Sequence, residues 1–196
     1  MPDVVIDKST TALLIADFYA DMMSSLPHAV DRQVVAKTQA VQQAARDAGI
    51  LVCYSATVFR PGYVEISDRN KTFSQRKASG QPAVSDPVSI IHASVKPIVG
   101  EVVVGKHLVN ALFGTDLDMT LRANNIETLI MLGYATSGVV LSTTRYAADA
   151  DYRLYIVEDC CSDQDPEVHD FLTQRIFPRQ ADVVNSQSVI EALAGA

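Results

Sequence analysis

Short apolar runs alternate with stretches of helical periodicity along the chain, and this alternation limits the possible folds more than any other feature. The strand-like runs are Thr11–Asp17, Ile50–Val58, Glu101–Val104, Ile126–Gly133, Tyr152–Glu158 and Ala181–Asn185. The predicted helices are Asp31–Ala48, Thr115–Asn124, Gly138–Ala150, Pro166–Phe177 and Ser186–Leu193. We expect Asp31 to cap the first helix and Gly49 to end it. Strands that are apolar throughout are buried on both faces, so the pattern predicts an α/β fold in which helices sandwich a parallel sheet.

The length of 196 residues fits a single domain, residues 1–196, and neither a repeat nor a linker divides the chain. The segment Phe59–Pro97 interrupts the alternation, because it is rich in proline and polar residues and has little periodicity. A loop of that length inside a compact domain is usually functional.

Charge and composition argue against several classes of partner. Sixteen basic residues against 23 acidic ones give a net charge of −7, whereas nucleic-acid binders normally carry a basic excess. No apolar run approaches the ~20 residues that span a bilayer, and the N-terminus does not have the pattern of a signal peptide. Three cysteines are too few for a disulfide framework. We therefore expect a cytoplasmic protein with reduced thiols that binds neither nucleic acid nor a membrane.

Two charged residues end predicted strands. Asp17 ends the first strand and Lys106 the third. Ligands of parallel α/β sheets bind beyond the carboxyl ends of the strands, so both side chains would face one crevice. Asp17 is then either a turn cap or a catalytic acid or base. Lys106 is either solvated or a cation that keeps Asp17 ionised or binds a substrate anion.

The turn Gly133–Gly138 joins the fourth strand to a helix. It does not match a phosphate-binding loop, because Val139 and Val140 follow where Lys and Ser or Thr are needed. It does not match the dinucleotide-binding fingerprint either, because G-x-G-x-x-G is absent. A helix N-terminus offers free N–H groups that suit a carbonyl oxygen, a carboxylate or a developing oxyanion. A plain strand-to-helix turn is the alternative.

Metal binding has little support in the sequence. The four histidines are His28, His92, His107 and His169. None of them lies in a D-x-H or H-x-H pattern, and C-x-x-C is absent too. We expect neither a metal nor another cofactor, and we interpret His169 as a hydrogen-bonded structural histidine rather than a base.

Three segments together resemble a known family. TALLIADF carries Asp17, VVVGKHLVNALFGTDLDMTLRANNIETLIMLGYATSG carries Lys106, and GYATSGVVLSTTRYAADADYRLYIVEDCCSD follows. They resemble the isochorismatase-like hydrolase superfamily, also called the cysteine hydrolases, over nearly the whole chain. The resemblance implies a three-layer α/β/α Rossmann-like sandwich with a mainly parallel six-stranded sheet. It also implies small carbonyl or amide substrates and homo-oligomers, commonly dimers or tetramers.

The resemblance also implies roles for particular residues. Asp17 and Lys106 match the catalytic aspartate and lysine of the family. Family members often have a cis peptide bond in the glycine turn, which maps to Tyr134–Ala135. Such a bond would help to aim the N–H groups of Ala135 and Val139 at one oxygen.

The chain departs from the family pattern at three places. Val139 stands where the amidase branches have their nucleophilic cysteine, which excludes a thioester at this position. True isochorismatases have glycine there and cleave a vinyl ether with the aspartate as general acid. Tyr19 replaces a glutamine found in many members, and Tyr54-Ser55-Ala56 replaces the D-x-H metal motif of nicotinamidase-like members.

The leading hypothesis is a cofactor-free hydrolase of a small molecule, with Asp17 as general acid and base, Lys106 as its partner, and an oxyanion hole formed by the Ala135 and Val139 amides. The candidate substrate-binding residues are Phe18, Tyr19, Arg60, Tyr63, Asn110, Phe113 and Tyr134. A catalytically inactive homologue that binds small molecules is the main alternative. A hydrolase whose nucleophile is Cys160 or Cys161 is a third.

Overall fold

Six strands form one parallel sheet in the computed structural model, which describes residues 3–195. The strands are β1 (Thr11–Ala16), β2 (Leu51–Thr57), β3 (Val102–Lys106), β4 (Thr128–Tyr134), β5 (Arg153–Ser162) and β6 (Asp182–Val184). Their order in the sheet is β3-β2-β1-β4-β5-β6, and each adjacent pair is parallel. The predicted parallel sheet is confirmed.

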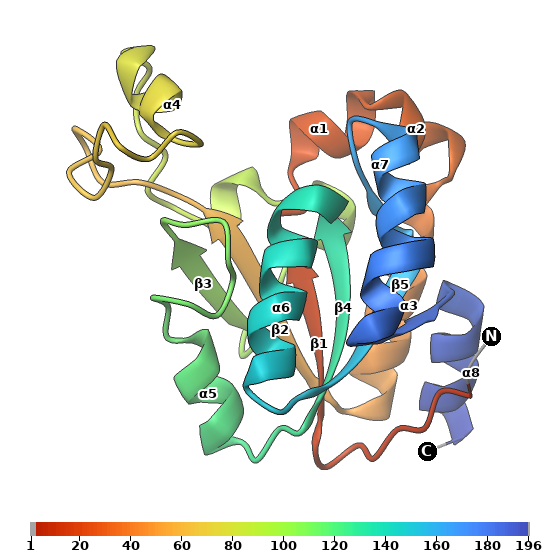
Figure 1. Ribbon diagram of the computed structural model, residues 1–196. Helices are drawn as coiled ribbons and strands as arrows, with labels where there is room; N and C mark the ends of the chain where they lie inside the picture. Colours follow the sequence, from red (N-terminus) through yellow and green to blue (C-terminus); the bar gives the residue numbers. More distant parts are fainter. Residues whose placement is uncertain (1–2, 196) are drawn as a thin grey trace.

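Helices cover both faces of this sheet (Figure 1). They are α1 (Ala20–Ser25), α2 (Pro27–Asp31), α3 (Val34–Ala48), α4 (Ser74–Ala78), α5 (Leu117–Ala123), α6 (Leu141–Asp149), α7 (Pro166–Phe171) and α8 (Ser186–Gly195). Short helical turns are η1 (Val88–Ile90), η2 (Ala93–Val95), η3 (Thr136–Val140), η4 (Leu172–Ile176) and η5 (Phe177–Arg179). The helices α3 and α8 pack together behind the sheet, and α6 lies in front of it, which gives the expected three layers. Within residues 3–195, no helix is both long and apolar enough to cross a membrane.

The core lies on both sides of the central strands. Every residue of β1 is buried, and β4 is buried from Thr128 to Gly133. A strand that is covered on both faces needs apolar side chains at successive positions, and this is why the central strands are continuous apolar runs in the sequence.

The predicted cap of the long helix was wrong. Asp31 is the last residue of α2, which begins at Pro27, and α3 begins only at Val34. Proline favours a helix start because its φ is preset and its missing N–H would have no partner there, so a separate short helix forms first. Gln33 then takes a left-handed conformation between the two helices. Gly49 ends α3 in the left-handed conformation, as predicted.

The fifth strand is longer than predicted. It continues past Glu158 to Ser162, so Cys160 and Cys161 lie inside the strand and do not follow it. The polar pair Glu158 and Asp159 suggested a strand end. In the structure, Arg32 binds the Glu158 carboxylate, and Ser186 donates to Asp159, so these polar residues are accommodated within the strand.

The segment Phe59–Pro97 is irregular, as predicted, with only α4, η1 and η2 as helical turns. We call residues 59–87 the arm, because they project from the β2–β3 side of the sheet (Figure 1). The arm has a small core of its own, formed by Phe59, Tyr63 and Ile66. These side chains pack apart from the main core.

Candidate active site

Neighbouring strands end side by side at one edge of the sheet. In the strand register, Lys106 at the end of β3 pairs with Thr57 at the end of β2, and Ala16 at the end of β1 pairs with Gly133. The order of the strands reverses between β1 and β4, which is the point where α/β sheets bind ligands. Asp17 directly follows β1 and therefore lies at this point.

Asp17 and Lys106 form a buried ion pair, with Lys106 Nζ 2.7 Å from Asp17 Oδ2. Lys106 also donates to Thr57 Oγ1 at 2.6 Å and to the Leu108 carbonyl at 3.0 Å, and only 1% of its surface is exposed. The Thr57 hydroxyl donates to the same Asp17 Oδ2 at 3.3 Å. Asp17 Oδ1 is buried and has no hydrogen-bond partner among the described residues. Because buried polar atoms normally have partners, Oδ1 stands out as an unused acceptor in the site.

Burial drives both members of the pair toward their neutral forms. It raises the pKa of Asp17 above its ordinary value, and the Lys106 charge opposes this shift. It lowers the pKa of Lys106, and here the Asp17 charge opposes it. Burial and the Asp17 charge also raise the pKa of Tyr19, so its hydroxyl stays protonated while it accepts the Thr57 N–H at 2.9 Å. An aspartate with a raised pKa exchanges its proton closer to neutral pH than an exposed one does.

The glycine turn lies next to this pair. The Tyr134–Ala135 peptide bond is cis, as the family resemblance implied. Gly133 has a φ of +145°, and a Cβ there would lie 2.0 Å from the carbonyl oxygen of Ala16. Only glycine lets β4 come this close to β1. The contact sets how near the turn lies to Asp17.

Two backbone amides of the turn were predicted to hold an oxyanion. The Ala135 N–H has no acceptor among residues 3–195, so it is available to a ligand. Val139 lies within η3, and its side chain is buried and apolar. Ser137, between them, donates its N–H to Asp163 Oδ2 at 2.7 Å, which anchors the turn to the end of β5.

All three cysteines are free and buried. Burial raises the pKa of Cys53 to about 12 and that of Cys161 to about 12, and it raises the pKa of Cys160 as well. A thiol is nucleophilic only as the thiolate, which is scarce at neutral pH when the pKa is this high. The cysteines therefore have the properties of structural core residues.

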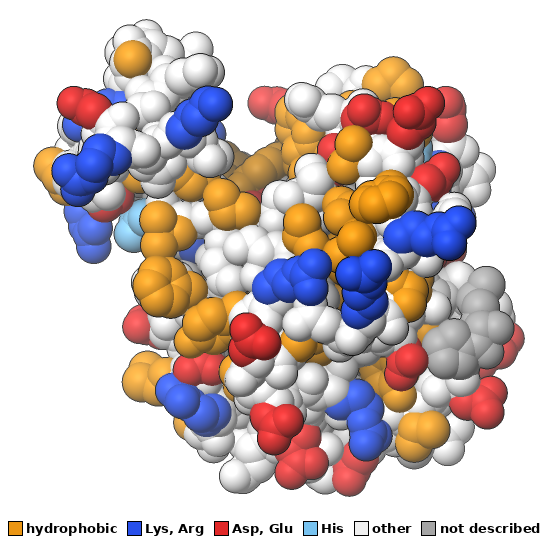
Figure 2. Space-filling view, in the orientation of Figure 1, with side chains coloured by type: hydrophobic (Ala, Val, Ile, Leu, Met, Phe, Trp, Pro, Cys, Tyr) orange, Lys and Arg blue, Asp and Glu red, His pale blue; other side chains and the backbone are white. Residues whose placement is uncertain are grey.

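A cavity of about 310 Å³ opens between α1 and the arm, where Figure 2 shows the surface notched. Its lining residues are Tyr19, Ala20, Asp21, Met22, Thr57, Arg76, Ser89 and Ile90. Thr57 contacts Asp17 and Lys106 directly, so this cavity adjoins the ion pair. Tyr19 is the predicted substrate-binding residue that the structure places in its wall.

Two further predicted residues lie at the same edge of the sheet. Phe18 follows Asp17 and is fully buried, and its carbonyl accepts the His92 N–H at 2.9 Å. Tyr134 ends β4 and is partly exposed. Burial raises the pKa of the Tyr134 hydroxyl, and the nearby Asp163 charge adds to this shift.

The other predicted substrate-binding residues have structural contacts elsewhere. Asn110 Nδ2 donates to the Ser142 carbonyl at 2.8 Å, and its Oδ1 accepts the N–H of Phe113 at 2.8 Å, so it ties a loop to α6. The Phe113 side chain is exposed at the surface. Tyr63 belongs to the small core of the arm, and Arg60 is exposed on the arm. Their place in substrate binding stays a prediction.

Two residues of the site were missed in the sequence. Thr57 was counted as part of the predicted strand Ile50–Val58 and was not considered as a site residue. A polar residue at the carboxyl end of an apolar strand could have indicated that it faces the site. Arg76 lies in the arm, where no periodicity indicated which side chains would reach the cavity.

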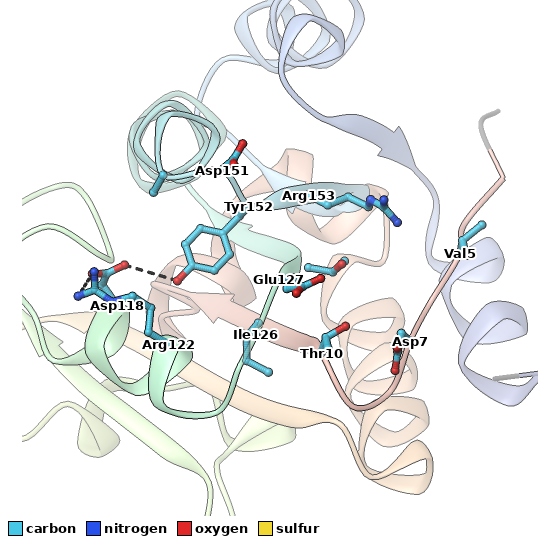
Figure 3. Close-up of a pocket in the computed structure, with 12 residues that line it drawn as sticks. Val5, Asp7, Thr10, Asp118, Arg122, Ile126, Glu127, Asp151, Tyr152 and Arg153 are labelled. Atoms are coloured by element: carbon cyan, nitrogen blue, oxygen red, sulfur yellow. Dashed lines mark hydrogen bonds and ion pairs between the residues drawn. The ribbon is translucent and has the colours of Figure 1, made fainter.

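A larger hollow of about 630 Å³ lies at the opposite end of the sheet, where the strands begin. Figure 3 shows Asp118 there between Arg122 and Tyr152. Asp118 forms an ion pair with Arg122 at 2.7 Å and accepts a hydrogen bond from the Tyr152 hydroxyl. Parallel sheets bind ligands at their carboxyl edge, so we place the candidate site at Asp17 rather than here. Among residues 3–195, no group of three His, Cys, Asp or Glu side chains is arranged to hold a metal.

A doubly wound parallel sheet with a buried aspartate–lysine pair at its switch point is the architecture of an α/β enzyme. A family model described as the isochorismatase domain matches residues 11–188, and the chain belongs to the isochorismatase family of hydrolases.

Named relatives and solved structures agree with this family. The chain is 29% identical to a probable isochorismatase from Pseudomonas chlororaphis, over 94% of this chain and 87% of that one. It is 27% identical to maleamate amidohydrolase from Pseudomonas putida, over 79% of this chain and 74% of that one. The solved structure of an isochorismatase family protein from Burkholderia thailandensis superposes with a TM-score of 0.79 at 27% identity, covering 97% of this chain and 98% of that one.

Proposed function

We propose that this chain hydrolyses a small molecule by general acid–base catalysis, without a cysteine nucleophile and without a cofactor. The observation that carries the proposal is Asp17. One of its oxygens, Oδ2, binds Lys106 and Thr57, while the other, Oδ1, is buried and has no hydrogen-bond partner within residues 3–195. Thr57, which contacts Asp17, lines the cavity between α1 and the arm. A carboxyl group in that setting can give a proton to a substrate and take one back.

The proton balance is simple for a vinyl ether substrate. Neutral Asp17 gives its proton to the vinyl carbon, and Lys106 stabilises the resulting carboxylate. Water attacks the oxocarbenium ion and returns a proton to Asp17, and the hemiketal then separates into a carbonyl compound and an alcohol. For an amide, Asp17 takes the proton from water and passes it to the leaving amine, while the Ala135 and Val139 amides hold the oxyanion.

The position of Val139 supports this non-covalent route, since a valine side chain has no nucleophile. A screen of the purified protein against vinyl ethers, amides and N-carbamoyl compounds tests the proposal. Turnover of one class identifies the reaction. Binding of these compounds without any turnover contradicts the proposal and defines a small-molecule-binding homologue.

Alkylation of the thiols is expected to leave activity unchanged within about twofold, because none of the buried cysteines is a low-pKa thiolate. The measurement is turnover after treatment with iodoacetamide, with mass spectrometry to count the modified residues. The denatured chain, in which all three thiols are accessible, is the control for reagent quality. Complete inactivation with protection by substrate would instead support Cys160 or Cys161 as the nucleophile.

The pH profile should follow the protonation of Asp17. If neutral Asp17 is the acid, kcat/KM is high below its pKa and falls about tenfold per pH unit above it. Because burial raises this pKa above 3.8, the fall begins at a higher pH than for an exposed aspartate. Thr57→Val removes a hydrogen bond that lowers the pKa, so it should move the fall to still higher pH. A downward movement would contradict this role of Thr57.

Self-association is also part of the proposal. Large apolar side chains are exposed on separate elements, among them Phe113, Met119 and Phe171. Figure 2 shows hydrophobic side chains on the face that carries α6 and α7. We expect a dimer or tetramer in solution, as the family resemblance implies, and the exposed apolar side chains are available to an interface. A monomeric mass by light scattering at micromolar concentration would contradict it.

A further inference from the structure

A chain of hydrogen-bonded polar side chains lies behind the glycine turn, with two members buried and two partly exposed, and it has no part in the mechanism above. It links Glu158 on β5, Arg32 between α2 and α3, His169 on α7 and Thr136 at the start of η3. These four residues come from separate parts of the sequence and meet beside the turn. The His169 side chain is almost completely buried.

The direction of each hydrogen bond in this chain follows from its donors. Arg32 Nη1 lies 2.6 Å from His169 Nε2, and a guanidinium can only donate, so Nε2 must accept. The ring is then neutral with its proton on Nδ1, which donates to Thr136 Oγ1 at 2.8 Å. The single hydroxyl proton of Thr136 is left for the Ser162 carbonyl at 3.0 Å.

Arg32 is itself held in place from several sides. Its guanidinium forms an ion pair with the Glu158 carboxylate and donates to the carbonyls of Glu158 at 3.2 Å and Cys161 at 3.3 Å. The His28 ring lies edge-on to His169, with centroids 4.9 Å apart, and its Nδ1 lies 3.1 Å from Ser162 Oγ. The arginine therefore presents Nη1 to His169 in a fixed position.

We propose that Arg32 and His169 are positioning residues for the glycine turn: Arg32 selects the Nδ1–H tautomer of His169, and that N–H fixes Thr136 and the backbone around it. Thr136 follows Ala135, whose N–H is a proposed oxyanion donor, and it precedes Val139 by three residues in the same turn. The catalytic importance of this arrangement rests on the proposed function. The tautomer and the order of the turn do not.

The tautomer can be measured directly by ¹⁵N NMR of the histidine rings in the full chain. We expect the His169 ring to be neutral with the proton on Nδ1. In Arg32→Met, Nε2 loses its donor and faces Glu158, so the proton should move to Nε2 in part of the molecules. A cationic ring or an Nε2–H tautomer in the unmodified protein would overturn the proposal, and so would an unchanged ring in Arg32→Met.

Two variants separate the two ends of the ring. The amide nitrogen of His169→Asn can take the place of Nδ1 and donate to Thr136, whereas the amide oxygen of His169→Gln can take the place of Nε2 and accept from Arg32. In His169→Asn, we expect the rate of amide hydrogen exchange in the glycine turn to stay within about threefold of the rate in the unmodified protein. In His169→Gln, we expect this rate to rise at least about tenfold. With a substrate from the screen, kcat should fall in the same order while KM changes little.

Arg46→Lys is the matched control. Arg46 is another partly exposed arginine paired with a glutamate, Glu101, but its other partners are Tyr54 and the Lys96 carbonyl. The Arg46→Lys variant should lower the free energy of unfolding without changing amide hydrogen exchange in the glycine turn. Equal exchange in the Asn and Gln variants would contradict the proposal. If no compound is turned over, the exchange and NMR results still decide it, so its failure and that of the proposed function are distinguishable.

Discussion

Asp17→Asn is expected to lower kcat/KM by about three orders of magnitude, which corresponds to about 4 kcal/mol of transition-state stabilisation. Asparagine keeps the shape of the side chain and can still contact Lys106 and Thr57, but it can neither give nor accept the catalytic proton. Steady-state kinetics on a substrate from the screen measure the effect. Circular dichroism shows whether the fold is retained.

Asp118→Asn is the matched control for this change. Asp118 is also paired with a cation, Arg122, but it lies at the opposite end of the sheet, so its loss should leave turnover unchanged within about twofold. A loss of less than about tenfold in Asp17→Asn would mean that Asp17 only caps a turn.

Lys106→Met is expected to cost nearly as much activity as Asp17→Asn, and the double variant should lose little more than the worse single one. The reason is that the two groups act as a unit. Lys106 stabilises the carboxylate that remains after Asp17 gives up its proton, and residues that act together lose activity non-additively. Losses that simply add in free energy would contradict the proposed pair.

Stability gives an independent check on the same pair. Removing one partner of a buried ion pair leaves a buried polar or charged group without its counterpart, which typically costs about 3–5 kcal/mol. Urea unfolding should therefore show that each single variant is destabilised and that the double variant recovers part of the loss. A double variant as unstable as the sum of the single ones would show that the two side chains do not depend on each other.

The sequence was most informative where burial determines the residue type. The central strands had to be apolar throughout, so they were visible in the sequence as continuous runs. The charged residues Asp17, which follows the central strand β1, and Lys106, which ends the edge strand β3, were then recognisable at the ends of predicted strands. The glycine turn was also visible, because Gly133 is required by a backbone approach that no other residue allows.

The rest depends on contacts between distant parts of the chain. The Asn110 amide donates to the Ser142 carbonyl, and no local pattern encodes that pairing. Glu158 looked like the end of a strand, because its partner Arg32 lies far away in the sequence. In the arm, side chains such as Tyr63 are directed by an irregular backbone that periodicity cannot describe.

The central position of β1 has a consequence for how the chain folds. Within this sheet, β1 pairs on one side with β2 and on the other with β4, where Thr11 lies opposite Thr128. During synthesis, β1, β2 and β3 can pair early. The backbone groups on the β4 side of β1 then stay unpaired until β4 has been synthesised. Contacts this distant in sequence slow folding, and an open apolar edge invites pairing with another chain. Folding yield should therefore fall with protein concentration when refolding starts from the unfolded state.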